Sequence, residues 1–369
     1  MQVLKISIQT QLNQYFKKQN MKKRNLSAKK KIHNFFLNKV KIPKIRKIYL
    51  EFKNKVEKYP VKNLSIATSG GSDSMALVFL SKCYSIEKNI KCYYFIVDHG
   101  LRKESAKEAK IIKNKLNKFD INPQILTWNK KKIFSNIQSR ARDKRYGLIF
   151  NECSKKKINL VLTAHHKDDL IENFFIRLFR GSGLKGLSSF NNIKTRIIKQ
   201  KNIHILRPLL NFSKKDLMYI TSSTFDYYIE DPSNNNNYFL RVKIRKLING
   251  LNQDGLDFNK FLKTIKNLNQ SNHTVEFYVK KNVQKNSKYL NNKKSIILND
   301  DFFYQPNEIV FRSLSEVIHK FGIKDKYTRG SKVINLLKNL NTLEKSKQIT
   351  LSGCLFKKVN KSVIISREN

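Results

Sequence analysis

The chain has 369 residues, with 75 Lys or Arg against 27 Asp or Glu, which gives a formal net charge of +48. A chain of this length can form two or three domains around a large core, so both enzymes and multidomain binding proteins stay open. The charge indicates a polyanionic partner, most often nucleic acid. Lys, Asn and Ile are also the residues that A/T-rich codons favour, so base composition is a second explanation of the charge.

The four cysteines, Cys83, Cys92, Cys153 and Cys354, are far apart in the sequence. They form no CxxC pair and have no His at zinc-ligand spacing, which argues against a zinc ribbon and a disulfide framework. No apolar stretch approaches the roughly 20 residues of a membrane span, and the amino end lacks the apolar core of a signal peptide. We therefore expect a cytoplasmic protein without a membrane partner, with an organelle as the less favoured location.

The first 50 residues contain 14 Lys or Arg and no Asp or Glu. This composition fits basic helices that lie on RNA, an organellar targeting segment or a poorly ordered tail, although the excess of Lys over Arg weakens the targeting alternative. Met21 is a second candidate for the start of the protein. We predict a basic N-terminal extension over residues 1–60 and leave its role open.

From residue 63 onward, short apolar runs alternate with helical patterns. Strands separated by helices of ordinary length imply βαβ units, so we predict an α/β fold with a doubly wound parallel sheet over residues 61–250. In such sheets, ligands bind beyond the carboxyl ends of the strands, where the polar clusters TSGGSDS, VDHGLR and TAHHKDD fall. The expected strands are 63–68, 91–100, 122–128 and 159–166, and the expected helices are 74–84, 104–119, 139–157 and 168–183.

The rest of the chain divides into a helical stretch and a small terminal domain. Residues 251–294 are rich in Lys and Asn and have a helical pattern, which predicts a helical linker. Two β-like runs joined by a polar turn lie near the carboxyl end. They predict a small α+β domain over residues 295–369.

Residues 69–74, SGGSDS, lie between the first expected strand and its helix. Adjacent glycines let backbone N–H groups approach an anion, the hydroxyls add donors, and the helix amino terminus adds partial positive charge. No Lys opens the helix, so the loop is not a Walker A sequence and suits holding pyrophosphate while an α-phosphate is attacked. Asp73 would then hold Mg²⁺ against the phosphates. An ordinary Ser/Gly turn is the alternative.

A second polar cluster, HHKDDLIEN, begins at His165. Asp169 and Glu172 are three residues apart and share one helix face, where they either bind a cationic group or complement the helix dipole. His165 or His166 could hold phosphate or accept a proton, and the sequence does not decide between the two.

Two further pairs carry open alternatives. Arg142 and Arg145 can share one face of the helix 139–157, where they either bind phosphate or developing charge, or form a solvated surface. Asp98 and His99 end the second strand and either hold ATP or metal or cap the following turn.

Several segments in this order, SGGSDS, VDHGLR, QSRARDKRYG, TAHHKDDLIEN, RLFRGSGLKGL, RPLL and DPSN, resemble the motifs of the tRNA(Ile)-lysidine synthase family. That family belongs to the PP-loop, or N-type, ATP pyrophosphatases. The resemblance is strong over roughly residues 60–250 and weak over 295–369. It implies a sheet of the adenine nucleotide alpha hydrolase type, and it implies that the regions 251–294 and 295–369 contact tRNA.

The resemblance implies a ligase that uses ATP and Mg²⁺ to join L-lysine to C2 of the wobble cytidine in isoleucine tRNA with the anticodon CAU. The cytidine oxygen attacks the α-phosphate and releases pyrophosphate, and the lysine ε-amine then displaces AMP. The product, lysidine, pairs with A instead of G, so decoding changes from AUG to AUA. The oligomeric state stays open, with a homodimer as one option.

Residue roles follow from the same resemblance, which assigns catalysis to Asp73, Arg145 and His165 and lysine binding to Asp169 and Glu172. ATP binding falls to Ser69, Gly70, Gly71, Ser72, Asp73, Ser74, Asp98 and His99, with Asp73 also the metal ligand. Binding of tRNA falls to Arg140, Arg142, Arg180, Arg241 and Arg245. After DPSN, Val242 departs from the family pattern by standing where an Asn is expected, and Tyr238 and Phe239 nearby could stack on a base.

Two alternatives remain for the function. Another PP-loop tRNA modifier, such as a thiolase with an external sulfur carrier, shares the fold, but such enzymes commonly carry paired cysteines, which this sequence lacks. A basic RNA-binding protein without catalysis is the second alternative. It does not account for the loop, the acids and the arginine helix together.

Overall fold

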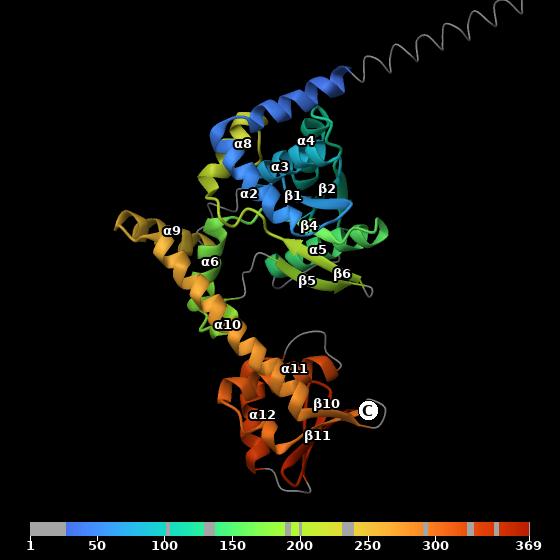
Figure 1. Ribbon diagram of the computed structural model, residues 1–369, viewed down its shortest axis with the longest axis vertical. Coiled ribbons are helices and arrows are strands. Elements are labelled where there is room, and N and C mark those ends of the chain that lie inside the picture. Colours follow the sequence, from blue (N-terminus) through green and yellow to red (C-terminus); the bar gives the residue numbers. More distant parts are fainter. Residues whose placement is uncertain are drawn as a thin grey trace, which may run out of the picture. The chain divides into compact units, whose positions relative to one another are not determined.

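The computed structural model of the protein describes residues 27–100, 104–128, 137–188, 193–198, 201–230, 240–290, 294–322, 328–342 and 347–368 (Figure 1). These residues form two compact units. Unit 1 comprises the described residues up to Ser182 and from 193 to Leu256, and unit 2 comprises residues 183–188 and the described residues from Asp257 onward. Each unit has its own sheet and its own buried core.

Unit 1 is built on a six-stranded sheet in the order β3-β2-β1-β4-β6-β5 (Figure 1). The first five strands in this order, β3, β2, β1, β4 and β6, are parallel to one another, which confirms the predicted sheet. The sixth strand, β5, pairs antiparallel with β6 at one edge. This edge hairpin lies outside the strands that the sequence predicts. The strands are β1 (Asn63–Thr68), β2 (Lys91–Asp98), β3 (Gln124–Thr127), β4 (Leu160–Leu162), β5 (Ile193–Ile198) and β6 (Lys201–Leu206).

Helices cover both faces of this sheet. Leu64 and Ile66 of β1 belong to a core shared with α2, α3, α4 and α8, whereas Phe95 and Val161 face the opposite side and pack with Ile149 of α5. Successive strand residues point to opposite faces, so apolar residues on both faces are what a doubly wound sheet requires. The helices are residues 27–40, α2 (Pro43–Glu57), α3 (Ser72–Lys88), α4 (Ser105–Asn117), α5 (Ile137–Lys155), α6 (Lys167–Leu178), α8 (Lys214–Thr224) and α9 (Leu240–Gln253).

The helix of residues 27–40 and α2 belong to the core of unit 1. Phe36 and Phe52, one from each helix, are fully buried. Phe36 stacks on Phe79 of α3 with the ring centroids 5.5 Å apart. The boundary that the sequence indicates near residue 60 therefore does not separate these helices from the α/β fold.

Replacement of Phe36 by Ala should destabilise unit 1 by about 3–5 kcal/mol, because it leaves a cavity against α3. Urea unfolding followed by the fluorescence of Trp128, the single tryptophan, measures this change within unit 1. The matched control is Leu37→Ala in the same helix, where Leu37 is 39% exposed and the change should stay within about 0.5 kcal/mol. Equal stability of the two variants would show that this helix does not fold with the sheet.

Unit 2 contains a five-stranded antiparallel sheet in the order β7-β8-β11-β10-β9 (Figure 1). Its core includes Phe302 and Phe356. The predicted small α+β fold is confirmed, although its sheet begins at Ser287 and not at residue 295. The strands are β7 (Ser287–Leu290), β8 (Ser295–Leu298), β9 (Gln348–Leu351), β10 (Cys354–Val359) and β11 (Ser362–Arg367). The helices are α7 (Leu184–Leu187), α10 (Phe258–Asn286), η2 (Asp300–Phe302), α11 (Asn307–Phe321) and α12 (Gly330–Thr342).

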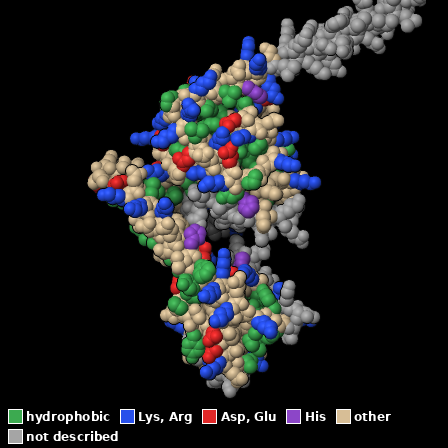
Figure 2. All heavy atoms as spheres, in the orientation of Figure 1, with side chains coloured by type: hydrophobic (Ala, Val, Ile, Leu, Met, Phe, Trp, Pro, Cys, Tyr) green, Lys and Arg blue, Asp and Glu red, His purple; other side chains and the backbone are tan. Residues whose placement is uncertain are grey.

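Within the described ranges, no helix combines the length and the apolar character that crossing a membrane requires. On the face shown in Figure 2, Lys and Arg side chains are scattered over the surfaces of both units and do not gather in one patch. A lysine-rich composition accounts for such a surface. Positive charge alone therefore does not mark a binding face in this view.

Candidate functional site

The loop of residues 69–74 joins β1 to α3 and is held by its own hydroxyl groups. The hydroxyl of Ser74 accepts a hydrogen bond from the backbone N–H of Ser69 (3.2 Å) and donates to the carbonyl of Gly71 (2.9 Å). Gly71 is the N-cap of α3, so the first turn of the helix presents its backbone N–H groups at this loop. An anion can bind there because these donors and the helix dipole act together.

Two contacts from residues much later in the chain fix the backbone of the loop. The N–H of Ile229 donates to the carbonyl of Gly70 (2.9 Å), and the hydroxyl of Thr221 donates to the carbonyl of Ser72 (2.7 Å). Gly70 has φ of +87°, and a Cβ atom there would lie 2.8 Å from Cγ1 of Ile112. Conformation and space therefore both require glycine at this position.

A Gly70→Ala variant should lose about 1–3 kcal/mol of stability, because it combines a strained backbone with a steric clash. Urea unfolding of unit 1 measures the loss, and the affinity for ATP should fall with it because the loop backbone shifts. Gly71→Ala is the control for stability, since Gly71 has φ of −72° and a Cβ there would meet only ordinary contacts at 3.8 Å. A Gly70→Ala protein as stable as this control would contradict the strain argument.

The end of β2 closes a turn beside the loop. The Oδ1 atom of the buried Asp98 accepts hydrogen bonds from the N–H of Gly100 (2.9 Å) and from the hydroxyl of Ser105 (2.7 Å). Asp98 therefore caps the turn that follows β2, and its expected role in holding ATP or metal stays a prediction. The neighbouring His99 has its Nε2 atom 2.9 Å from Nη2 of Arg145, so α5 brings one predicted catalytic residue to a predicted ATP-binding residue.

His166 is buried at the start of α6 and connects this helix to the loop. Its Nδ1 atom accepts from the N–H of Asp168 (3.2 Å), and the carboxylate of Asp169 accepts from the N–H of His166 (3.2 Å). The Nε2 atom lies 3.5 Å from Oδ2 of Asp73 and 3.6 Å from Oδ2 of Asp169. Burial lowers the pKa of His166, but hydrogen bonding to Asp168 and Asp73 and the charge of Asp169 raise it to about 10. The ring is therefore protonated near pH 7, and Nδ1–H then donates to the Asp168 carboxylate (3.4 Å) while Nε2–H faces Asp73 and Asp169. The Nδ1 atom accepts from the N–H of Asp168 only in the neutral ring.

His165, one residue earlier, lies in different surroundings. Its Nδ1 atom is 3.0 Å from Oγ1 of Thr163. Burial lowers the pKa of His165 well below its usual value, and the positive charges of Arg207, Arg142 and Arg241 lower it further. The His165 ring is therefore neutral near pH 7 and lies in a region of positive potential.

The two acids predicted to bind lysine lie against two arginines predicted to bind tRNA. Glu172, which is 4% exposed, accepts a hydrogen bond from Nε of Arg245 at 2.5 Å, and its Oε2 atom is 3.3 Å from Nε of Arg241. Nη2 of Arg241 is also 4.0 Å from Oδ1 of Asp169. These residues thus form one charged cluster between α6 and α9, whereas the sequence placed them in separate groups.

The remaining arginines predicted to contact tRNA lie at the surface of unit 1. Arg142 is exposed, and its guanidinium carbon is 5.9 Å from the ring centroid of Tyr146. Arg140 is exposed on α5, and Arg180 is exposed just beyond the end of α6. Side chains in such positions can reach the phosphates of a nucleic acid, and that role stays a prediction. Tyr238 and Phe239 lie outside the described residues.

Arg207 is a site residue that the sequence reasoning did not single out. It follows β6 directly, is only 5% exposed, and its charge acts on His165. A buried guanidinium is costly unless it is compensated by partners or by an anion. The signal available in the sequence was the position of RPLL directly after an apolar strand, where ligand-binding residues of parallel sheets occur.

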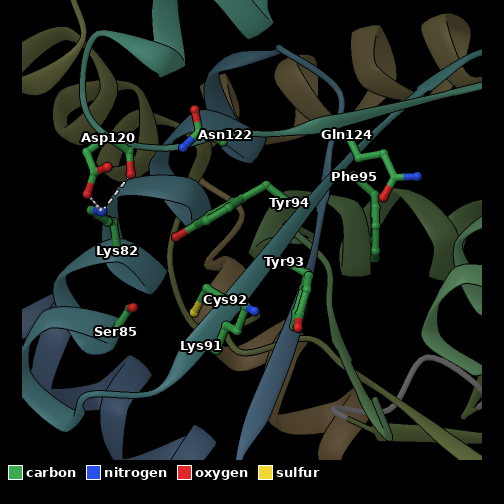
Figure 3. Close-up of a pocket in the computed structure, with 10 residues that line it drawn as sticks. All are labelled: Lys82, Ser85, Lys91, Cys92, Tyr93, Tyr94, Phe95, Asp120, Asn122 and Gln124. Atoms are coloured by element: carbon green, nitrogen blue, oxygen red, sulfur yellow. Dashed lines mark hydrogen bonds and ion pairs between the residues drawn. The ribbon is translucent and has the colours of Figure 1, made fainter. Parts of the chain in front are cut away.

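A separate cavity of about 310 Å³ lies along β2, lined by residues of its amino-terminal half and away from Asp98 at the other end. Figure 3 shows Lys82 beside it, with the ammonium group donating to the carbonyl (2.7 Å) and the carboxylate (3.0 Å) of Asp120. The side chain of Tyr94 extends from β2 toward Lys82. The cavity is therefore not part of the cluster at the carboxyl ends of the strands.

Comparison with curated proteins finds relatives over about half of the chain. The tRNA(Ile)-lysidine synthase of Orientia tsutsugamushi (strain Boryong) is 41% identical over 188 residues, which are 51% of this chain and 42% of that protein. The tRNA(Ile)-lysidine synthase of Rickettsia rickettsii (strain Sheila Smith) is 41% identical over 194 residues, which are 52% of this chain and 39% of that protein. The match therefore spans about two fifths of the length of these relatives.

Among solved structures, the U34-tRNA thiolase NcsA from Methanococcus maripaludis with its 4Fe-4S cluster is similar in fold, with a TM-score of 0.50. The sequence identity is 13%, and the match covers 63% of this chain and 78% of that chain. At this identity the likeness concerns the fold alone. The model of the PP-loop domain family matches residues 44–251, more than half of the chain. On this match, and with the loop, the parallel sheet and the strand-end cluster in place, the chain belongs to the PP-loop domain family.

Proposed function

We propose that this protein is an ATP-dependent ligase that joins L-lysine to the wobble cytidine of isoleucine tRNA with the anticodon CAU. The observation that carries the proposal is the meeting of three groups at the carboxyl ends of adjacent strands. These groups are the lysine-free loop with Asp73, the pair His165–His166, and the acids Asp169 and Glu172. The names of the relatives that match half of the chain at 41% identity support the same assignment.

The reaction has two bond exchanges. In the first, O2 of the cytidine bonds to the α-phosphorus of ATP, and the bond from that phosphorus to the bridging oxygen breaks to release pyrophosphate. In the second, the ε-nitrogen of lysine, after losing a proton, bonds to C2 of the base, and the C2–O2 bond breaks to release AMP. Both steps require that the enzyme position two reactants and stabilise phosphate charge.

The loop supports the first step. Its backbone N–H groups and hydroxyls suit the leaving pyrophosphate, and Asp73 stands at the start of α3 where the phosphates would lie. Among the described residues no group of three or more His, Cys, Asp or Glu side chains could hold a metal ion. Proteins usually bind Mg²⁺ through one or two carboxylates and the phosphates of the substrate, and Asp73 can supply such a carboxylate. Bound there by Asp73, Mg²⁺ would neutralise charge on those phosphates.

The charged cluster between α6 and α9 supports the second step. The carboxylates of Asp169 and Glu172 can receive the ammonium groups of free lysine, which are cations like the guanidinium groups that now contact them. Lysine would therefore exchange with Arg241 or Arg245 at these carboxylates. The released arginine is then available to a phosphate of the tRNA, which reconciles the two roles expected for the cluster.

Unit 2 has features that suit RNA. Phe277 and Tyr278 of α10 are 60% and 51% exposed, and the exposed Lys280 and Lys281 follow after one buried residue, Val279. Exposed aromatic rings next to lysines can stack on unpaired bases while the lysines contact phosphates. We therefore extend the proposal to tRNA contacts by this unit.

A tRNA thiolase is the second candidate, and the cysteines disfavour it. Sulfur transfer needs accessible thiolates, whereas burial raises the pKa of every cysteine thiol in this chain. The pKa is about 12 for Cys92, about 11 for Cys153 and Cys354, and well above the usual value for Cys83. All four are free and none is paired with another.

The proposal is tested by incubating the full chain with ATP, Mg²⁺, labelled L-lysine and CAU-anticodon isoleucine tRNA. Label should enter the RNA, and AMP and pyrophosphate should form in equal amounts to the label. The matched substrate control is the same tRNA with U in place of the wobble C, which lacks the base to be modified and should take up no label. Incorporation of labelled sulfide instead of lysine would favour the thiolase, and incorporation of neither would favour a binding protein.

A further inference from the structure

Thr163 contacts the ring of His165 at the carboxyl end of β4. The hydroxyl oxygen of Thr163 is 3.0 Å from Nδ1 of His165, and Thr163 is only 4% exposed. The backbone N–H of Thr163 donates to the carbonyl of Leu206 in the neighbouring strand (3.0 Å), so the side chain starts from a fixed backbone. The His165 ring is therefore positioned by a side chain whose backbone is fixed to the sheet.

The direction of this hydrogen bond follows from the surroundings of the hydroxyl group. Within the described part of the chain, Nδ1 of His165 is the one hydrogen-bond partner of the Thr163 hydroxyl. If Nδ1–H donated to Thr163, the buried hydroxyl hydrogen would have no acceptor, which is costly. If the hydroxyl donates to Nδ1, the hydroxyl hydrogen has an acceptor within the protein. The second arrangement places the single ring proton of a neutral His165 on Nε2.

The charges around His165 keep the ring in this neutral form. Arg207 follows β6, Arg142 lies on α5 and Arg241 lies on α9, and all three act on the ring with positive charge, as does the neighbouring His166. A ring in such surroundings is a poor proton acceptor, so it does not suit the removal of a proton from lysine. The same positive potential attracts phosphate, to which a neutral ring can donate through Nε2–H.

We infer that Thr163 is a positioning residue, which holds His165 as the neutral Nε2–H tautomer so that the ring donates a hydrogen bond to a phosphate oxygen of the bound nucleotide. This inference rests on the proposed function, because it takes the nucleotide to be the ATP of that reaction. It narrows the two roles that the sequence leaves open for the histidines. His165 is a donor to phosphate and not a general base.

The tautomer can be read directly by nitrogen-15 NMR of histidine-labelled full-length protein, with the His165 signals identified by their absence from a His165→Gln variant. Between about pH 6 and pH 8, Nδ1 should have the shift of a nitrogen without a proton and Nε2 that of an N–H. Thr163→Val keeps the volume but removes the hydroxyl, so it should give averaged tautomers, and Thr163→Ser should restore the wild-type shifts. A protonated Nδ1 in the wild type, or unchanged shifts in Thr163→Val, would overturn the inference.

The donor role has its own measurements. Addition of ATP and Mg²⁺ without tRNA should shift the Nε2 signal of the wild type, which needs no turnover. In ATP–pyrophosphate exchange, His165→Ala should lose about 100-fold or more, whereas His165→Gln, whose amide donates but cannot take up a proton, should retain at least about 10-fold more activity than His165→Ala. Thr163→Val should lose roughly 10-fold in exchange activity and Thr163→Ser should lose little, while both variants keep the stability of the wild type in urea. If both His165 variants lost exchange activity equally, the ring would act as a base and the donor role would be wrong.

Failure of the inference and failure of the proposed function are distinguishable. If the wild type transfers no lysine to tRNA, the proposed function fails, while the NMR shifts with and without ATP still decide the tautomer and the phosphate contact. If lysine is transferred but the Nε2 signal does not respond to ATP, the inference fails and the ligase stands.

Discussion

An Asp73→Asn variant should lose ATP–pyrophosphate exchange by at least about 100-fold. Two losses combine in this variant. Asp73 supplies the carboxylate proposed to hold Mg²⁺ at the start of α3, and its Oδ2 atom lies 3.5 Å from Nε2 of His166. The amide keeps the size of the side chain but removes the charge on which both contacts depend.

The control for Asp73 is Asp143→Asn. Asp143 is an exposed acid on α5 in the same unit, so its amide variant should keep full exchange and shows what an unspecific loss of charge does. Excess Mg²⁺ should recover part of the Asp73→Asn activity if the carboxylate binds the metal. Unchanged exchange in Asp73→Asn would remove the phosphate-loop assignment.

A Glu172→Gln variant should lose lysine transfer by roughly 10- to 100-fold while it keeps the formation of adenylated tRNA. Glu172 is buried between Arg241 and Arg245, so the loss of its charge removes an acceptor for the lysine ammonium group. Rapid-quench measurement of the two steps separates them, because adenylated tRNA should accumulate in the variant. Loss of both steps to the same degree would count against a docking role.

The fold of a Glu172 variant needs its own control, since breaking a buried ion pair is destabilising. Glu172→Asp keeps the charge and should retain more transfer than Glu172→Gln at similar urea stability. Glu57→Gln is the surface control, because the side chains of Glu57 in α2 and its partner Lys88 are 35% and 39% exposed, so this pair should matter little. A Glu172→Gln protein that is unfolded would be recognised by its missing exchange activity.

The sequence predicts the parallel sheet well because its strands are short apolar runs that end in polar clusters. The expected strands 63–68 and 91–100 are found as β1 and β2. It does not predict the antiparallel β5, whose residues mix Lys and Arg with Ile. An edge strand needs one apolar face at most, so its pattern is weaker than that of a central strand.

The charge of the amino-terminal region concealed its place in the core. The spacing of Ile45, Ile48, Phe52 and Val56 in α2 is that of an amphipathic helix and could have indicated burial. Fourteen basic residues without an acid drew the interpretation toward a separate extension instead. Net charge describes the exposed face of a helix, whereas packing is decided by its apolar stripe.

Pairings across the site could not be predicted from the sequence in the same way. The spacing of Asp169 and Glu172 places both acids on one helix, but the approach of Arg245 depends on how α9 packs against α6. The same holds for Arg207, whose influence on His165 results from the adjacency of β4 and β6 in the sheet. Local patterns give the residues of a site, and tertiary packing gives their partners.

The hydrogen bonds that fix the loop of residues 69–74 can form only after much of the chain has been synthesised. The hydroxyl of Thr221 that holds the carbonyl of Ser72 comes 149 residues later in the chain, and Ile229 follows after it. A ribosome that has made β1, α3 and β2 has therefore produced the loop residues but not the groups that fix them. Contacts so distant in sequence form late in folding, because the intervening loop must be closed first. We expect nascent chains that end before Thr221 to bind no ATP, so nucleotide capture would report that the whole of the first sheet has assembled.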